Sequence, residues 1–171
     1  YDPSLSRNKL SYDFSGELGL SYMSSENVVL IMNDKYQGVY QLCEHIRIDK
    51  NRIDITDWEK VAEDSAEVIA EAEGFSDAGD LEDSMIENMA WITTGQVSFQ
   101  GAVYKLEDYK IELPDIDGGY LLELDKNQDE VSHFYTSKQQ PLMFKSPEYV
   151  KTNSDMMNYV INYINAFENA V

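Results

Sequence analysis

The side chain whose setting most suggests chemistry is Glu44, a carboxylate in the middle of the apolar run VYQLCEHI. Burying a charged carboxylate without a partner is costly, so such a residue either faces solvent or is held in place for a purpose. On the first interpretation, Glu44 lies on the wet face of a strand and pairs with Arg47 or Lys50. On the second, it serves a binding site. The residues around Glu44 leave both interpretations open.

One other segment imitates a ligand-binding motif. Asp125, Asn127 and Asp129 have the spacing of the first three ligands of a calcium loop. That loop then needs glycine, where this chain has Glu130, and ends on glutamate, where it has Thr136. We therefore expect a surface turn here and no metal site.

The remaining candidates for catalysis lack the neighbours that they would need. The two histidines, His45 and His133, are far apart in sequence, and neither has a nearby serine or cysteine pattern typical of a triad. The sequence contains no Walker A loop and no GxGxxG motif. The single cysteine, Cys43, excludes an internal disulfide, and its apolar surroundings predict a buried structural thiol.

The charge of the chain restricts its partners. The net charge is -19 and the pI is about 4.2, so a nucleic acid or an anionic membrane surface would repel the chain. No apolar run approaches the roughly 18 residues of a membrane span. Residues 57–91 hold twelve acidic residues and one lysine, Lys60. We interpret this excess as the solvated face of a helical hairpin and not as a metal site.

Glu44 must be positioned by a β-hairpin over residues 27–48. The run NVVLIM is followed by a turn at Asn33-Asp34-Lys35 and a returning strand from Tyr36 to Ile48, with a bulge expected at Gly38. Before it, Asp2-Pro3 predicts the start of a helix that ends at Gly19. Its apolar residues recur every four positions and predict one buried face: Leu10, Phe14 and Leu18.

The rest of the chain mixes helices and strands. A capping box at Thr56–Glu59 predicts a helix that ends at Gly74, and a second helix spans residues 81–92. The stripe of the first of these helices comprises Trp58, Val61, Ala62, Ser65, Val68, Ile69 and Ala72. Further on, we expect a hairpin turning at Gln100-Gly101, strands over 120–124 and 141–145, and a last helix capped by Asn153 or Ser154. Without strict βαβ alternation, this order favours an α+β domain.

Several segments together resemble the CotH (spore coat protein H) family. The first is DPS followed by RNKL over residues 2–10, and the most specific is VVLIMNDKYQGVYQLCEHI over residues 28–46. The runs DKNRIDI, GGYLLELD and FKSPE, at residues 49–55, 118–125 and 144–148, are similar to the branch found in clostridial and other gut bacteria. The resemblance covers most of the chain, with residues 57–117 as a branch-specific insertion.

The resemblance implies a protein-kinase-like fold and phosphorylation of protein substrates with ATP and a divalent metal such as Mg²⁺. It places the first helix where a kinase has helix αC and the hairpin at the end of the small lobe. Glu44 would border the adenine, and Arg7 would face the phosphates or be structural. It also implies export to the spore coat, the cell surface or a cellulose-degrading complex.

The chain starts at Tyr1 and ends inside a helical pattern, so we expect a partial domain cut from a longer protein. By the resemblance, the basic residue near the phosphates would precede Tyr1, and the catalytic and metal-binding aspartates would follow Val171. Phosphoryl transfer depends on such metal-positioning groups. The 171 residues alone are therefore expected not to transfer labelled phosphate from ATP to a protein.

Two functions compete. In the first, the parent is an ATP-dependent protein kinase that phosphorylates serine or threonine, and this chain is mainly its small lobe with an acidic insertion. In the second, it is a non-catalytic surface module that binds protein or carbohydrate on a kinase fold that has lost activity. A pair of aspartates in a kinase context beyond Val171 would favour the first.

Overall fold

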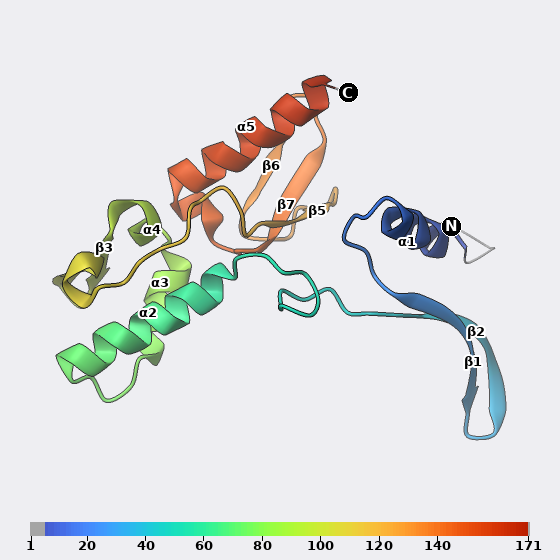
Figure 1. Cartoon of the computed structure of the whole chain (residues 1–171), viewed down its shortest axis with the longest axis horizontal. Coiled ribbons are helices and arrows are strands. Elements are labelled where there is room, and N and C mark those ends of the chain that lie inside the picture. Colours follow the sequence, from blue (N-terminus) through green and yellow to red (C-terminus); the bar gives the residue numbers. More distant parts are fainter. Residues whose placement is uncertain (1–5, 171) are drawn as a thin grey trace. The chain divides into compact units, whose positions relative to one another are not determined.

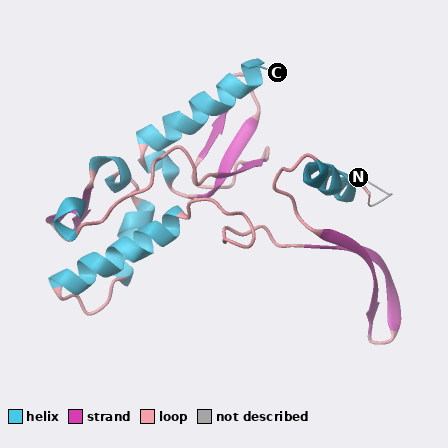
Figure 2. Ribbon diagram, viewed as in Figure 1, coloured by secondary structure: helices cyan, strands magenta, loops and turns pink. Residues whose placement is uncertain are grey.

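The computed structural model describes residues 6–170, which form two compact units, one ending at Asp54 and the other beginning at Ile55 (Figure 1). Helices and strands are mixed in an α+β arrangement with small antiparallel sheets, as predicted (Figure 2). The predicted helix start at Asp2-Pro3 lies outside the described residues. The first unit contains α1 (Arg7–Glu17), β1 (Ser25–Met32) and β2 (Lys35–Cys43).

The second unit holds the remaining elements, with four helical segments before a three-stranded sheet and two after it. They are α2 (Trp58–Glu73), α3 (Gly79–Glu87), α4 (Trp91–Thr94), β3 (Gln96–Phe99), β4 (Ala102–Lys105), the 3₁₀ helix η1 (Leu106–Tyr109), β5 (Leu121–Leu124), β6 (His133–Tyr135), β7 (Pro141–Ser146), the 3₁₀ helix η2 (Val150–Thr152) and α5 (Ser154–Ala170). Across residues 6–170, none of the helices has the length and apolar character of a membrane span.

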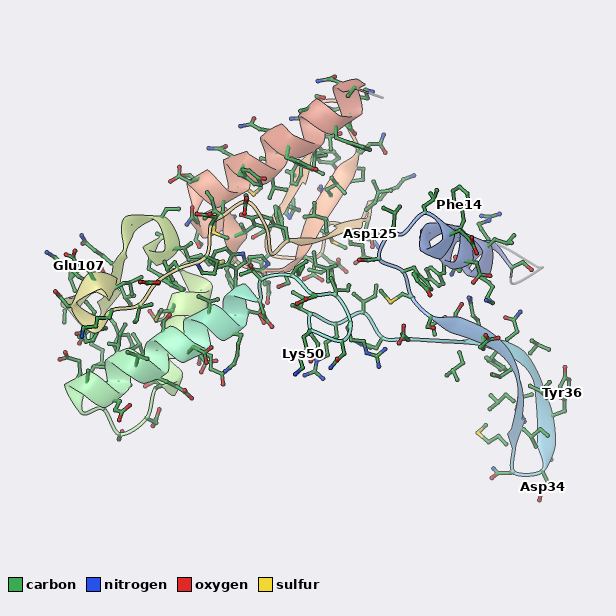
Figure 3. The ribbon with its side chains drawn as sticks, viewed as in Figure 1. Phe14, Asp34, Tyr36, Lys50, Glu107 and Asp125 are labelled. Atoms are coloured by element: carbon green, nitrogen blue, oxygen red, sulfur yellow. The ribbon has the colours of Figure 1, made fainter. Side chains whose placement is uncertain are left out.

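Helix α1 ends where the sequence predicted, but its apolar face is not buried. Gly19 adopts a φ of 71° just beyond the helix, a conformation that glycine reaches without a steric cost. Leu10, Phe14 and Leu18 are 66%, 65% and 57% exposed, so the expected buried face is wrong within this chain. Phe14 is labelled on α1 in Figure 3. The spacing identifies which face is apolar, but the first unit has too few elements to enclose it.

The β1–β2 hairpin forms as predicted in its turn and its bulge. Asn33 and Asp34 both have positive φ, 52° and 58°, as a two-residue hairpin loop requires. The pairing shifts register after Leu30, which faces Gly38, and Gly38 has a φ of 121°. The second strand ends at Cys43 and not at Ile48, so Glu44 lies just beyond it.

The expectation of a buried thiol at Cys43 is wrong. Cys43 is exposed, because in the part of the chain that the structure describes the hairpin is a sheet of two strands. Its neighbours along both strands are exposed too, including Val29, Ile31 and Leu42 at 61%, 64% and 65%. An apolar run in a strand therefore does not by itself identify a buried face.

Helix α2 attaches the acidic segment to the core of the second unit. Its N-cap is Asp57, whose side chain accepts a hydrogen bond from the amide of Lys60, and not Thr56 as the capping box predicted. Gly74 ends the helix with a φ of 74°, as predicted. Of the stripe predicted for this helix, Trp58 is buried, whereas Val68 is 43% exposed. The buried residues of α2 are Trp58, Ala62, Ser65, Ala66, Ile69 and Ala70.

The single helix predicted over residues 81–92 is two helices. Helix α3 ends at Glu87 and lies beside α2 (Figure 1), and α4 begins at Trp91. Between them, the Met89 amide donates to Thr152 Oγ1 at 2.9 Å, and Asn153 Nδ2 donates to the Met89 carbonyl at 2.9 Å. These distant partners replace the hydrogen bonds of a continuous helix.

The hairpin β3–β4 turns at Gln100 and Gly101 as predicted, with φ of 48° and 82°. The sheet that follows has the order β5-β7-β6, with β7 central and both pairings antiparallel. Strands β5 and β7 were predicted, but β6 was not. The loop after β5 is a turn, as expected, in which the Asn127 amide donates to Asp125 Oδ1.

Helix α5 begins after Asn153, one of the two predicted caps. It packs on the sheet through Met156 and Val160, which join Phe134 and Phe144 in the core (Figure 1). The hydrophobic side chains buried among the described residues all belong to the second unit. The second unit therefore contains the hydrophobic core, whereas the apolar side chains of the first unit are largely exposed.

Candidate functional site

A polar cavity of about 340 Å³ lies in the first unit, beside the end of the β1–β2 hairpin. One wall is the segment between α1 and β1, and the other is the segment that follows β2. The volume falls at the lower end of the roughly 300–1,000 Å³ typical of small-molecule sites. Its lining residues are Gly19, Leu20, Ser21, Tyr22, Met23, Ser24, Glu44, His45, Asn51, Arg52 and Ile53.

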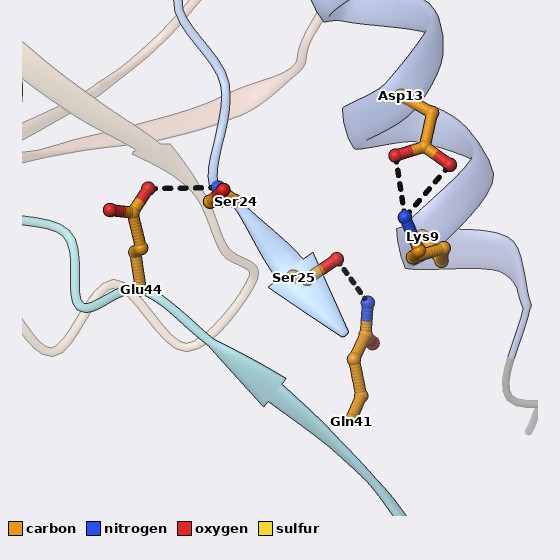
Figure 4. A network of polar contacts seen from close by, with 6 residues as sticks. All are labelled: Lys9, Asp13, Ser24, Ser25, Gln41 and Glu44. Atoms are coloured by element: carbon orange, nitrogen blue, oxygen red, sulfur yellow. Dashed lines mark hydrogen bonds and ion pairs between the residues drawn. The ribbon is translucent and has the colours of Figure 1, made fainter. Parts of the chain in front are cut away.

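Glu44 connects the two walls. Its carboxylate accepts a hydrogen bond from the Ser24 amide at 2.9 Å, and its own amide donates to the Ser24 carbonyl at 3.0 Å (Figure 4). The other carboxylate oxygen forms an ion pair with Arg52 Nη1. The Glu44 side chain is 40% exposed, so it is neither buried nor freely solvated. This carboxylate therefore holds the cavity wall together while remaining accessible to a ligand.

Arg52 reaches Glu44 because the chain turns sharply at Asp49. The Asp49 carboxylate accepts from the Asn51 amide at 2.9 Å, and the Asp49 carbonyl accepts from the Arg52 amide at 2.8 Å. Such an Asx turn reverses the chain within a few residues. It brings Arg52 to Glu44, where the sequence suggested Arg47 or Lys50 as the partner. The aspartate that starts the run DKNRI was the signal that could have identified Arg52.

The other sequence candidates fall in different places. Arg7 is exposed at the first turn of α1 and does not line this cavity. The structure therefore does not bring Arg7 and Glu44 to one described cavity. His45, to which the sequence assigned no role, does line the cavity next to Glu44.

A second local network stabilises the same end of the first unit (Figure 4). Lys9 and Asp13 pair across one turn of α1, with distances of 2.8 and 3.0 Å from Nζ to the two carboxylate oxygens. The hydrogen bond to Asp13 raises the pKa of Lys9. Gln41 Nε2 donates to Ser25 Oγ across the hairpin at 3.0 Å. The Gln41–Ser25 bond links β1 and β2 next to Ser24 and Glu44, whereas the Lys9–Asp13 pair stabilises α1 alone.

The cavity suits a ligand with both polar and charged groups. Arg52 offers a guanidinium, Asn51 an amide, His45 an imidazole and Glu44 a carboxylate. A guanidinium is the side chain best matched to phosphate or carboxylate oxygens. Within residues 6–170, no three or more histidine, cysteine, aspartate or glutamate side chains gather as a metal site.

Comparison with known proteins gives a family. No curated protein matches the chain, and no solved structure does. A family model described as CotH kinase protein matches residues 1–170. The match spans both units, from the cavity beside Glu44 to the end of α5, and agrees with the resemblance of the YQGVYQLCE segment. The chain therefore belongs to the CotH kinase family.

Proposed function

We propose that this chain supplies part of the nucleotide site of an ATP-dependent protein kinase, and that the cavity beside Glu44 is that part. The observation that carries the proposal is the position of Glu44 on the wall of a polar cavity, paired with Arg52, in a member of the CotH kinase family. From the family resemblance we expect this glutamate near the border of the adenine. A cavity at this position is what such a role requires.

The lining residues fit a nucleotide better than they fit a metal ion. Arg52 and Asn51 would hold the polar or anionic groups of ATP through charge-assisted and neutral hydrogen bonds. Glu44 would keep Arg52 oriented toward the cavity, so its part is to position another group. Mg²⁺ would supply charge neutralisation during phosphoryl transfer. The cavity offers a single carboxylate, so we assign no metal-dependent step to its residues.

We further propose that the whole protein phosphorylates serine or threonine in a protein of the spore coat or the cell surface, and that it is exported. Family membership supports these proposals. The alternative is a non-catalytic surface module that binds protein or carbohydrate. Nucleotide binding separates the two, because a module that has lost kinase activity need not retain the cavity for ATP.

The proposal predicts a specific effect of Glu44→Gln in the whole protein. Glutamine keeps the shape and can still accept from the Ser24 amide, but it removes the charge that holds Arg52. An exposed ion pair contributes only about 0–1 kcal/mol, so the melting temperature should change little. ATP affinity should fall at least about tenfold, or roughly 1.4 kcal/mol, as measured by calorimetry with Mg-ATP.

Glu26→Gln is the matched control, because Glu26 is an exposed glutamate on β1 that does not line the cavity. It should leave both ATP affinity and melting temperature unchanged. Unchanged ATP affinity in Glu44→Gln would remove Glu44 from the site. A large loss of stability with unchanged affinity would show a structural acid instead. If the unmodified protein binds no ATP, the non-catalytic module is the better description.

A further inference from the structure

A second cavity, of about 420 Å³, lies in the second unit between the start of β5 and helix α5. Its walls are mostly apolar and include Leu122, Val160 and Ile164. Its polar side is formed by three tyrosines and by the turn at Asp117 and Gly118. Cavities with an apolar body and a few converging polar groups are typical small-ligand sites. The nucleotide proposal does not use this cavity.

The three tyrosines form a continuous row. Tyr120 stacks on Tyr159 with ring centroids 6.2 Å apart and planes at 27°, and Tyr159 stacks on Tyr163 at 6.3 Å and 22°. Tyr163 ends the row and is 64% exposed. An aromatic side chain left exposed at the edge of a cavity offers a contact surface for a flat or cationic group.

Two of the three tyrosine hydroxyls in this cavity already donate their protons and can only accept from a ligand. The Tyr120 hydroxyl donates to the Ile116 carbonyl at 2.6 Å, and the Tyr159 hydroxyl donates to the Asp117 carbonyl at 3.1 Å. The two phenol oxygens therefore have only lone pairs left. Asp117, an exposed residue that lines the cavity, carries a carboxylate with two further accepting oxygens. A tyrosine is protonated at neutral pH, and burial, with smaller contributions from Tyr159 and Asp117, raises the pKa of Tyr120 still further.

The negative charge of the second unit also favours a ligand that donates hydrogen bonds. From Ile55 onward the sequence has 24 acidic residues, seven lysines and no arginine. Such a surface attracts cations and repels anions over distances of about a Debye length. A phosphate-bearing ligand is therefore disfavoured, whereas a positively charged donor is favoured both by the field and by the accepting oxygens.

We propose that this cavity binds the side chain of an arginine presented by a protein partner. The aliphatic stem would lie along Leu122, Val160 and Ile164, and the guanidinium would pair with Asp117. Arginine fits better than lysine because its planar, weakly hydrated head stacks on aromatic rings and pairs with a carboxylate through two hydrogen bonds. The inference is independent of the nucleotide site, since it concerns another unit and needs no ATP.

The test is an NMR titration of the ¹⁵N-labelled chain with the peptide acetyl-Gly-Arg-Gly-amide. We expect saturable shifts of the Gly118, Gly119 and Tyr120 amides. The same peptide with citrulline, which keeps the shape of arginine without its charge, should bind at least about tenfold more weakly. Equal binding of citrulline, or of norleucine in its place, would show an apolar cavity without cation selectivity. Absence of saturable shifts would also overturn the proposal.

Two variants separate the cavity from the general negative field. Asp117→Asn should weaken the arginine peptide at least about fivefold, whereas Asp115→Asn should change its affinity less than about twofold. Asp115 is an exposed carboxylate two residues away that does not line the cavity. Both variants lose one charge, so equal losses in the two would mean diffuse attraction and no specific site. An unchanged amide spectrum away from residue 117 would verify that Asp117→Asn still folds.

Discussion

Trp58→Ala should lower the free energy of unfolding of the second unit by about 3–5 kcal/mol, the range for truncating a buried large aromatic residue. Trp58 is 0% exposed and belongs to the main core cluster. Its Nε1 donates to the Gly118 carbonyl at 3.1 Å, so it also ties the start of α2 to a turn 60 residues away. Urea denaturation followed by circular dichroism measures the loss.

The backbone beside Trp58 is closely packed, which limits how far it can move to fill the space left by alanine. Gly119, with a φ of 83°, lies so close that an added Cβ would be 2.5 Å from Trp58 Nε1 and 2.6 Å from the Thr56 carbonyl oxygen. A backbone held this tightly on both sides cannot collapse far into the space that alanine leaves. The cost should therefore lie in the upper part of the range for such substitutions.

Two variants test this explanation. Trp58→Phe keeps an aromatic ring and loses the hydrogen bond to Gly118, so it should cost about 1–3 kcal/mol. Val68→Ala, on the same helix but 43% exposed, should cost less than about 1 kcal/mol. A loss of less than about 1 kcal/mol in Trp58→Ala would contradict the buried position. Equal losses at positions 58 and 68 would show that the helix face is assigned incorrectly.

The features that sequence predicted well depend on local chemistry. The turns at Asn33-Asp34 and Gln100-Gly101 and the helix end at Gly74 need backbone conformations that few residues adopt easily. Their residues identify them without knowledge of the rest of the fold. Glu44 was singled out for the same reason, because a charge within an apolar run is visible in the sequence alone.

The features that sequence missed depend on partners far away in the chain. Strand β6 has only three residues and exists because it pairs with β7. The face of α1 is apolar by spacing, yet among the described residues it stays exposed. Arg52, the partner of Glu44, required a turn to be placed first. Spacing gives the period of an element, but its neighbours decide which face is buried.

The break between α3 and α4 shows this dependence most clearly. The apolar spacing of residues 81–92 suits one helix, but the Met89 amide and carbonyl bond to Thr152 and Asn153 instead. Asn153 is 2% exposed, and its side chain links the segment between α3 and α4 to the start of α5. The Nδ2 group donates to Met89 and Thr93, while Oδ1 accepts from the Asp155 and Met156 amides at 3.1 Å each.

Asn153→Ala should therefore lower the free energy of unfolding by about 2–4 kcal/mol. Loss of the N-cap of α5 accounts for about 1 kcal/mol. Loss of the two hydrogen bonds from Nδ2 to the Met89 carbonyl and Thr93 Oγ1 adds about 1–3 kcal/mol, while the Met89 carbonyl still accepts from the Ile92 amide at 3.1 Å. Asn153→Ser restores an oxygen that can cap α5, but its shorter side chain cannot reach the Met89 carbonyl. It should therefore recover only the stability due to the cap. Urea denaturation gives the totals, and amide hydrogen exchange shows where protection is lost.

The comparison between serine and alanine at position 153 determines whether the residue is more than a helix cap. If it is, Asn153→Ser should remain at least about 1 kcal/mol less stable than the unmodified chain, with faster exchange around Met89 and Trp91. Asn158→Ala, on the exposed side of α5, makes the same substitution without buried partners and should change stability by less than about 0.5 kcal/mol. Full recovery by serine would mean that the cap alone stabilises α5, and the break after α3 would then need another cause.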